Sequence, residues 1–422
     1  MVSDVNRLKE TIDTERIKHR IEEFSEIGKD PIRGMTRPGL SEEETVAKRK
    51  AISLMRESGL HVSVDPFGNV IGRREGSDPR ALPIMTGSHL DTVQNGGRFD
   101  GTVGVVAALE VIHALNTLKM ITRHPIEVIV FTSEEPNRFG ISAFGSKGLS
   151  AKWNFGELSK LKDERGTPFP EALRSAGIDW ESLLKIHKPS RLHAFIEIHV
   201  EQGQRLYQKG IPIGVVLGVT GIYRQQVTVR GESNHSGTTP MTLRKDALAT
   251  ASEIILTAER CAQTEGDEDA TATVGRIQVR PNQVNIIPGE VLLTVEFRSF
   301  LPERLCKMKE RFAENLSEIR ERRETEILVE EILDQPPLTF SEKVIHSILK
   351  GIDALAFPSL NLFSMAGHDA NHLASITDAG MIFVPSKEGF SHCPQEWTDA
   401  EDVAKGCMVL LHSILYIDGE NQ

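Results

Sequence analysis

The sequence has few cysteines, and those that occur are scattered. Only four are present in 422 residues, and no two of them stand in a CxxC pair. Such spacing argues against a zinc knuckle and against a disulfide framework. It favours a reducing compartment, so we expect a cytoplasmic protein.

Long apolar runs, nucleotide motifs and an excess of positive charge are also missing. No stretch approaches the ~20 apolar residues of a membrane span, and the charged N-terminus lacks the apolar core of a signal peptide. Neither a Gly-x-Gly-x-x-Gly nor a Gly-x-x-x-x-Gly-Lys-Ser/Thr sequence indicates a nucleotide site. With 49 basic and 60 acidic residues, the net charge of −11 argues against nucleic acid or an anionic membrane as the main partner.

The overall composition and the length are typical of a globular protein. A hydrophobic content of 39% and a charged content of 26% are ordinary for soluble proteins. The length exceeds that of one common core, so we expect two domains.

Residue periodicity predicts a regular alternation of helices and strands. The predicted helices cover 7–28, 41–57, 103–118, 245–261, 302–323, 341–355 and 399–416. Predicted strands cover 61–64, 70–72, 82–86, 126–131, 194–199, 223–230, 272–279, 291–298, 326–333 and 381–384. Ser41 and Glu44 have the spacing of a capping box, and Ser341 is the expected cap of a later helix. Residues 151–190 are expected to form surface helices and connections.

Between 218 and 334 the predicted order is strand, helix, strand, strand, helix, strand. That order fits a small four-stranded sheet with two helices on one face. We therefore expect an α/β catalytic domain with a mixed sheet flanked by helices, built from 1–217 and 335–422. An α+β domain is inserted between these parts at 218–334.

Histidine and carboxylate side chains follow several of the apolar runs. His89, Asp91 and Asp100 come after the run that Gly87 and Ser88 end, and they fall in a glycine-rich loop. Glu134 and Glu135 follow the strand 126–131, while His199 closes the strand 194–199 and His392 follows 381–384. Because sites in open α/β sheets lie beyond the carboxyl ends of strands, we expect these side chains at one edge. Each motif alone also fits a solvated polar loop.

Together these residues form a ligand set suited to divalent metals. The candidate ligands are His89, Asp100, Glu135, His199 and His392. Five ligands with one bridging carboxylate suit two metal ions about 3.5–4 Å apart. Neighbouring side chains in an extended segment point opposite ways, so Glu134 is the candidate general base. Asp91 is expected to support His89 through the second ring nitrogen.

Longer motifs resemble one known family. They are Gly87-Ser-His-Leu-Asp-Thr, Phe99-Asp-Gly, Ser133-Glu-Glu-Pro-Asn-Arg-Phe, Glu197-Ile-His-Val-Glu-Gln-Gly, Gly231-Glu-Ser-Asn-His-Ser-Gly-Thr-Thr-Pro-Met and Ala366-Gly-His-Asp-Ala. The chain resembles the hydantoinase/carbamoylase family of dinuclear metal amidases, which is related to metallo-exopeptidases. The resemblance implies that Asp100 bridges two metals, with His89 and His199 on one and Glu135 and His392 on the other.

The resemblance also implies a lid and dimerisation role for the inserted domain. His235 would stabilise an oxyanion, reaching the partner's site in a homodimer. Asn285 and Arg298 would hold the substrate carboxylate, for which the planar fork of arginine is suited. Gln202 and the backbone of Gly367 would line the same pocket.

The expected activity is hydrolysis of an N-carbamoyl-L-amino acid to the L-amino acid, ammonia and CO2. Alternatives are allantoate amidohydrolase, β-ureidopropionase and a non-catalytic metal-stabilised dimer. The expected cofactors are two divalent ions per subunit, zinc or else manganese, cobalt or nickel. His368 and Asp369 are expected to support the site without binding metal, whereas His372 and Cys393 are expected to be structural.

Overall fold

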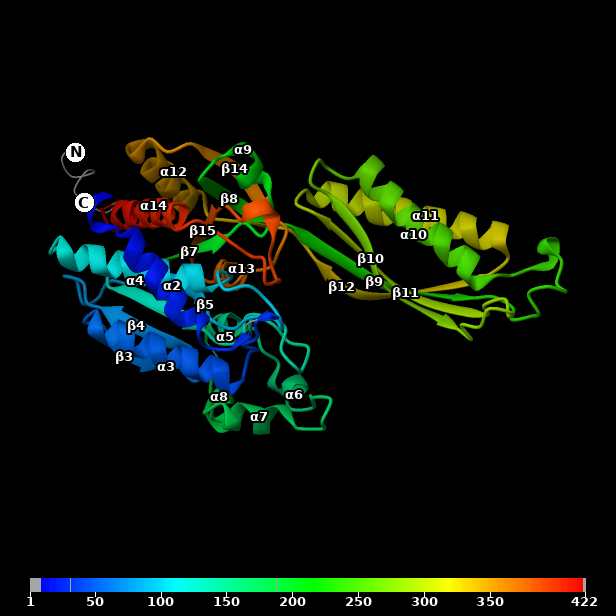
Figure 1. Cartoon of the computed structure of the whole chain (residues 1–422), viewed down its shortest axis with the longest axis horizontal. Coiled ribbons are helices and arrows are strands. Elements are labelled where there is room, and N and C mark those ends of the chain that lie inside the picture. Colours follow the sequence, from blue (N-terminus) through cyan, green and yellow to red (C-terminus); the bar gives the residue numbers. More distant parts are fainter. Residues whose placement is uncertain (1–8, 31, 187, 420–422) are drawn as a thin grey trace. The chain divides into compact units, whose positions relative to one another are not determined.

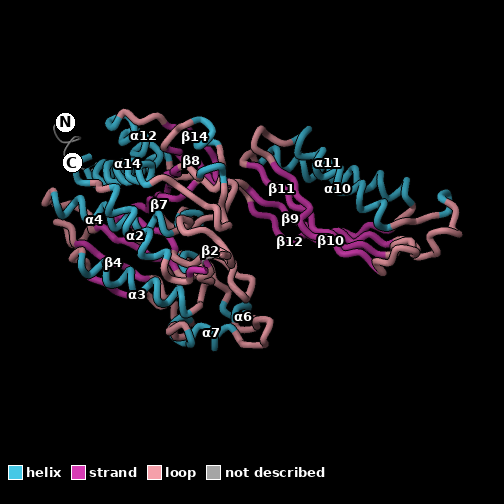
Figure 2. Tube along the Cα trace, in the orientation of Figure 1, coloured by secondary structure: helices cyan, strands magenta, loops and turns pink. Residues whose placement is uncertain are grey.

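The computed structural model describes residues 9–30, 32–186 and 188–419, and the chain divides into two compact units. The large domain contains the residues up to Leu217 and those from Phe340 onward. The small domain is Gly218–Thr339. Each is described by itself (Figures 1 and 2).

A mixed nine-stranded sheet forms the centre of the large domain, and the paired residues 218–219 and 338–339 at its edge fall within the bounds of the small domain. Its strands are β3 (His61–Val64), β4 (Val70–Arg74), β5 (Ile84–His89), β6 (Ile126–Phe131), β7 (Ala194–Val200), β8 (Ile213–Val219), β13 (Leu338–Thr339), β14 (Ser359–Ser364) and β15 (Asp378–Val384). They lie in the order β13-β8-β15-β7-β5-β6-β4-β3, and β14 pairs with β8. The central strands β15, β7, β5 and β6 are parallel, and antiparallel strands flank them.

Helices cover the central strands of this sheet, which are buried, whereas the edge strand β3 is mostly exposed (Figure 1). The long helices α2 (Thr14–Ser25), α3 (Glu42–Glu57), α4 (Thr102–Thr117), α12 (Glu342–Leu355) and α14 (Ala400–Gly419) share one hydrophobic core. From β7 that core takes Ala194, Ile196 and Ile198, so the alternate residues Glu197 and His199 point to the other face. The short helices α5 (Phe144–Leu149) and α13 (Asp369–Leu373) contact the strands there.

The segment 151–190 is more than a surface connection. Its short helices are α6 (Phe155–Leu158), α7 (Phe169–Ser175) and α8 (Trp180–Leu183), and α9 (Arg205–Lys209) follows after β7. Phe169, Leu173 and Leu183 are fully buried and pack with Phe67 and Phe144 in a separate apolar cluster. The prediction of surface elements was therefore wrong for the apolar face of this segment.

The small domain has an antiparallel sheet in the order β10-β11-β9-β12. Its elements are β9 (Gly221–Arg230), α10 (Ala247–Glu265), β10 (Thr271–Arg280), β11 (Glu290–Ser299), α11 (Pro302–Arg323) and β12 (Glu326–Gln335). Buried residues alternate along β9 and β11 and pack with both helices, so one face of the sheet forms the core. The role of this domain as a lid or dimerisation unit remains a prediction.

Several local predictions need correction. Helix α2 begins at Thr14, because the Asp13 carboxylate caps it, and residues 7 and 8 lie outside the described residues. Likewise, the helix predicted from 245 begins after Asp246, which caps α10. Ser341 makes no capping hydrogen bond, since its hydroxyl donates to Asp378. Strands β8 and β14 were not predicted.

Strand β5 also continues further than predicted, through Gly87 to His89. Gly87 has a φ of 146°, and a Cβ there would lie 2.0 Å from the carbonyl oxygen of Ile129 on β6. Glycine is therefore what lets the two strands pair to their ends. No described helix combines the length and the apolar composition that crossing a membrane requires.

Candidate metal centre

The order of the central strands brings the predicted ligands to one edge of the sheet. Along the chain, β6 is added on one side of β5 and β7 on the other, so the order reverses at β5. Such a reversal leaves a crevice at the carboxyl ends of the strands. His89 ends β5 and His199 lies near the end of β7, with their ring centroids 5.9 Å apart.

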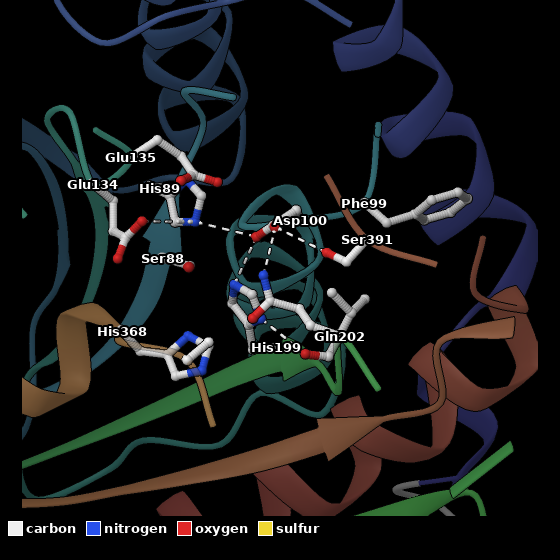
Figure 3. A network of polar contacts seen from close by, with 12 residues as sticks. Ser88, His89, Phe99, Asp100, Glu134, Glu135, His199, Gln202, His368 and Ser391 are labelled. Carbon is white, nitrogen blue, oxygen red and sulfur yellow. Dashed lines mark hydrogen bonds and ion pairs between the residues drawn. The ribbon is translucent and has the colours of Figure 1, made fainter. Parts of the chain in front are cut away.

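Asp100 contacts the histidines that come from both strands (Figure 3). Its Oδ1 is 3.0 Å from Nε2 of His199 and 3.5 Å from Nε2 of His89. The other oxygen, Oδ2, is 3.1 Å from Nε2 of His392. Nε2 of His392 is also 3.0 Å from Oε1 of Glu135. One carboxylate therefore links two clusters of ligand atoms.

The donor set fits divalent metal ions. His89, Asp100 and His199 form one group whose ligand atoms lie within 4.8 Å of one another, and Asp100, Glu135 and His392 form a second. Imidazole nitrogen and carboxylate oxygen are ligands of zinc and of similar ions. Four of the five residues are buried, and His392 is exposed, so the second group is the more open.

Glu134 stands outside both groups but next to them. Its Oε2 is 3.9 Å from Nε2 of His89, and its side chain is 14% exposed. Burial, with repulsion from Asp369 and Glu135, raises the pKa of Glu134 well above its usual range, although His89 opposes this. A carboxylate with a raised pKa that is not itself a ligand has the properties of a general base.

Asp91 lies next to His89 and also contacts the loop after β6. The second nitrogen of His89, Nδ1, lies 3.0 Å from the backbone oxygen of Asp91 and 3.6 Å from its carboxylate. That carboxylate also accepts the backbone N–H groups of Glu134, at 3.0 Å, and Glu135, at 2.9 Å. The Asp91 carboxylate therefore holds the loop after β6 and also lies within ion-pair distance of His89.

Charge on the three histidines stabilises the central carboxylate. Burial opposes ionisation, yet His199, His392 and His89 lower the pKa of Asp100 well below its usual range. Hydrogen bonds to Asp100 and Glu135 raise the pKa of His392 to about 11. The carboxylates of Asp100 and Glu135 thus attract positive charge, as the acidic ligands of a bound cation must.

Left-handed backbone conformations occur at three non-glycine residues of the site. Ser133, Gln202 and His392 have φ values of 51°, 58° and 57°. Such strain is common where side chains must be aimed at a ligand. Nε2 of Gln202 donates to Oδ2 of Asp100 at 2.8 Å, so Gln202 contacts the central carboxylate.

Two buried acids of the site carried no predicted role. Glu396 accepts the backbone N–H groups of Phe99, at 2.7 Å, and Asp100, at 3.0 Å, and burial raises its pKa to about 7. Glu197 accepts the hydroxyl of Ser88 at 2.7 Å, and burial raises its pKa. The sequence could have indicated both acids, because Glu396 lies four residues after His392 and Glu197 lies two residues before His199.

The residues expected to support the site lie close to it. Neither His368 nor Asp369 belongs to the two ligand groups, and the His368 ring lies 4.5 Å from that of His199. Nε2 of His368 is 2.8 Å from the hydroxyl of Ser364. Gly367 precedes His368 in the loop between β14 and α13.

The remaining predicted residues belong to the small domain. Nδ1 of exposed His235 accepts the N–H groups of Gly237, at 3.0 Å, and Thr238, at 3.2 Å. The ring proton is therefore on Nε2, which makes that atom a donor. Asn285 lies beside His235, since its carbonyl accepts the N–H of Ser236 at 3.0 Å.

Arg298 is not close to Asn285 within this domain. Asn285 precedes β11, whereas Arg298 is near its end, and its Nε donates to Glu296 at 2.7 Å. The eight steps from Glu290 to Arg298 span about 26 Å of extended strand. Whether Asn285 and Arg298 hold one substrate carboxylate stays a prediction, and their positions favour a site to which two chains contribute.

Comparison with known proteins shows the family to which this chain belongs. The profile of peptidase family M20/M25/M40 matches residues 85–416. An N-carbamoyl-L-amino acid amidohydrolase of Geobacillus stearothermophilus is 38% identical, over 96% of this chain and 98% of that protein. The allantoate amidohydrolase of Escherichia coli is 32% identical, over 92% of this chain and 94% of that protein.

A solved structure is also similar to this chain over nearly its whole length. An amidase of the hydantoinase/carbamoylase family from Burkholderia multivorans superposes with a TM-score of 0.89 at 33% identity, covering 97% of this chain and 98% of that chain. The chain thus belongs to peptidase family M20/M25/M40 and is a member of the hydantoinase/carbamoylase family.

Proposed function

We propose that this chain is a metal-dependent amidohydrolase of N-carbamoyl-L-amino acids. It hydrolyses the ureido C–N bond, and one water converts the substrate to the L-amino acid, ammonia and CO2. The observation that carries this proposal is the Asp100-centred pair of ligand groups with Glu134 beside it. The N-carbamoyl-L-amino acid amidohydrolase of Geobacillus stearothermophilus, at 38% identity over nearly the whole chain, supports the substrate class.

His89, Asp100 and His199 would hold one divalent ion, and Asp100, Glu135 and His392 a second. Zinc, manganese, cobalt and nickel all accept such ligands. Ions bound there supply Lewis acidity, which acidifies water and polarises a carbonyl group. Glu134 takes the proton of the attacking water and returns it to the leaving nitrogen.

The small domain supplies donors for the substrate. Nε2–H of His235 donates to the oxygen on which negative charge develops, as an oxyanion-stabilising group. Arg298 holds the α-carboxylate, and Gln202 and the Gly367 backbone line the pocket. Since Asn285 and His235 lie together and far along the strand from Arg298, they serve the partner's site in a homodimer.

Allantoate is the second candidate substrate. The Escherichia coli allantoate amidohydrolase, at 32% identity over 92% of the chain, favours it. Allantoate also carries a ureido group and a carboxylate, so the same residues would serve. β-Ureidopropionase activity is the third candidate, with the carboxylate one carbon further from the ureido nitrogen.

The test is ammonia release by protein loaded with zinc or manganese. N-carbamoyl-L-methionine, N-carbamoyl-β-alanine and allantoate are run side by side, with an EDTA-treated control. We expect turnover of the carbamoyl-L-amino acid and none after EDTA. Turnover of allantoate alone would move the protein to ureide breakdown, and no turnover of any substrate by protein with bound metal would refute the proposal.

A further inference from the structure

Four consecutive backbone N–H groups run through the loop that carries Glu134 and Glu135. The amides of residues 132–135 all donate to buried side chains that come from other parts of the chain. Asn69 accepts the first at 2.9 Å, Glu44 the second at 2.9 Å, and Asp91 the third and fourth at 3.0 and 2.9 Å. All three acceptors are at most 2% exposed. The backbone of the loop is thus held at each residue by an acceptor outside it.

Glu44 is used here in an unexpected way. In a capping box the glutamate returns to the backbone of its own cap residue. The hydroxyl of Ser41 does accept the N–H of Glu44 at 3.1 Å, but the Glu44 carboxylate accepts from Leu40, at 2.6 Å, and Ser133. Both carboxylate oxygens of Glu44 therefore accept a backbone N–H group. One group belongs to Leu40, before helix α3, and the other to Ser133, 89 residues after Glu44.

Buried positive charge compensates these acids. Nζ of Lys48 lies 2.9 Å from Oε1 of Glu44 and donates to the hydroxyl of Thr132 at 2.8 Å. Arg37 is fully buried, and its Nε donates to the carbonyl of Leu90. A buried carboxylate persists only where such partners exist, so Glu44 belongs to a built set of charges.

The loop needs this restraint. Ser133 has a φ of 51°, a conformation that non-glycine residues rarely adopt and that neighbours must enforce. Gly39 lies so close that a Cβ there would be 2.1 Å from the hydroxyl of Ser133. The loop is therefore fixed from two sides, by hydrogen bonds to Glu44 and by contact with Gly39.

We propose that Glu44 is a positioning residue, which aims Glu134 and Glu135 by holding the amide between β6 and those two side chains. The expected effect of Glu44 on turnover rests on the proposed function, whereas its expected effect on amide exchange in the loop does not. A shift of the Ser133 amide would move Glu134 from the attacking water and Glu135 from His392.

The test compares Glu44→Gln with two variants of the same helical turn, all as full-length, metal-loaded protein. The glutamine turns an NH2 group toward one of the two N–H donors, so one hydrogen bond is lost. Ser41→Ala removes the cap of α3 but leaves the contact between Glu44 and Ser133 intact. Glu43→Gln changes an exposed carboxylate one residue away.

We expect Glu44→Gln to lower kcat about 10- to 100-fold with little change in KM or metal content. Amide hydrogen exchange at 133–135 should accelerate about tenfold or more relative to strand β6. Both control variants should keep wild-type kcat and the slow exchange of these amides. If Glu44→Gln does not fold, Glu44→Asp keeps the charge but is one methylene too short to reach both amides, and the same results are expected.

Equal losses in Ser41→Ala would overturn the proposal, because they would show a general effect of a weakened α3. Wild-type exchange at 133–135 in Glu44→Gln would overturn it as well. The exchange measurement needs no substrate, so it remains decisive if the wild-type protein hydrolyses no carbamoyl compound. Inactive wild type with accelerated exchange in the variant would refute the proposed function alone.

Discussion

Glu134 and Glu135 are neighbours in the chain, yet their side chains lie in different surroundings. Oε1 of Glu135 is 3.0 Å from Nε2 of His392, whereas Oε2 of Glu134 is 3.9 Å from Nε2 of His89. Successive side chains of an extended segment point apart. These positions fit the roles proposed above, a metal ligand for Glu135 and a general base for Glu134.

Replacing Glu134 by glutamine should separate chemistry from metal binding. The amide cannot accept the proton of water, so we expect kcat to fall about 10²- to 10⁴-fold. Bound metal and thermal stability should stay close to wild type, because Glu134 is outside both ligand groups. Steady-state kinetics and elemental analysis of the purified protein measure both quantities.

Glu135→Gln is the matched comparison, since it changes the same functional group one residue away. That variant should lose metal as well as activity. If Glu134→Gln turned over at the wild-type rate, or if it lost metal as Glu135→Gln does, then Glu134 would not be the base.

His372 should make the folded protein sensitive to acid. Burial, with repulsion from Lys147 and Lys152, lowers the pKa of His372 to about 3. Its unfolded pKa is near 6.5, so between these values the unfolded chain binds the extra proton. The free energy of unfolding is therefore unaffected by His372 above pH 6.5. It decreases as the pH falls from 6.5 toward 3, because only the unfolded chain takes up the proton there.

His372→Gln removes that proton uptake. Relative to wild type it should gain about 1–2 kcal/mol in free energy of unfolding between pH 7.5 and pH 5. Urea unfolding at several pH values measures this difference. His19→Gln, on an exposed side of α2, is the control, and a constant difference between His372→Gln and wild type would contradict the assignment.

At the scale of the element, β5 depends on one glycine for its pairing with β6. A Cβ at residue 87 would meet the carbonyl of Ile129 at 2.0 Å, which backbone on a buried strand cannot relieve. Gly87→Ala should therefore lower the free energy of unfolding by about 3 kcal/mol. Metal binding should weaken too, because His89 is two residues further along the same strand.

Gly59→Ala is a suitable control for this substitution. Gly59 also has a positive φ, of 79°, but nothing lies within 4 Å of its position for a Cβ. Its variant should show the smaller cost of backbone conformation, about 1 kcal/mol. Equal unfolding free energies for the two variants would mean that the contact with Ile129 does not limit residue 87.

Elements were predictable where their pattern is local. Helix 302–323 and strand 126–131 were predicted at the observed bounds, because the first shows one uniform helical period and the second is one short apolar run. Strand β8 was missed, since its sequence Ile213-Gly-Val-Val-Leu-Gly-Val has no alternation and contains two glycines. The cap at Ser341 failed because Asp378, far along the chain, takes its hydroxyl.

At the scale of the whole molecule, the proposal requires two chains for each site. His235 and Asn285 lie together, and Arg298 is at the other end of β11. If His235 serves the partner's site, two inactive variants should complement each other. A dimer of one Glu134→Gln chain and one His235→Ala chain would contain one intact site and one doubly altered site.

Co-expression of the two variants with different tags gives this mixed dimer, which tandem purification isolates. With random pairing, the unfractionated mixture should recover roughly a quarter of wild-type activity, because half of the dimers have one of two sites intact. Each variant expressed alone is the control and should be nearly inactive. A purified mixed dimer without activity would place His235 in the site of its own chain.

The sequence by itself indicated which residues are the candidate metal ligands. Each candidate ligand ends or follows an apolar run. Such a run can be recognised from six or seven adjacent residues, as in Ala194–Val200. The histidines and acids in these positions also identify the family. Local order along the chain needs no knowledge of which strands are neighbours.

Only the tertiary structure decided how those residues meet. The strand order places His89 beside His199, and it lets Glu44 accept an amide 89 residues away. Asp91 likewise binds the backbone of Glu134 and Glu135 through its carboxylate, a contact that its position beside His89 in the sequence did not predict. Such contacts join segments that are distant in sequence, and the packing of buried polar groups selects them, because each must find a partner once water is excluded.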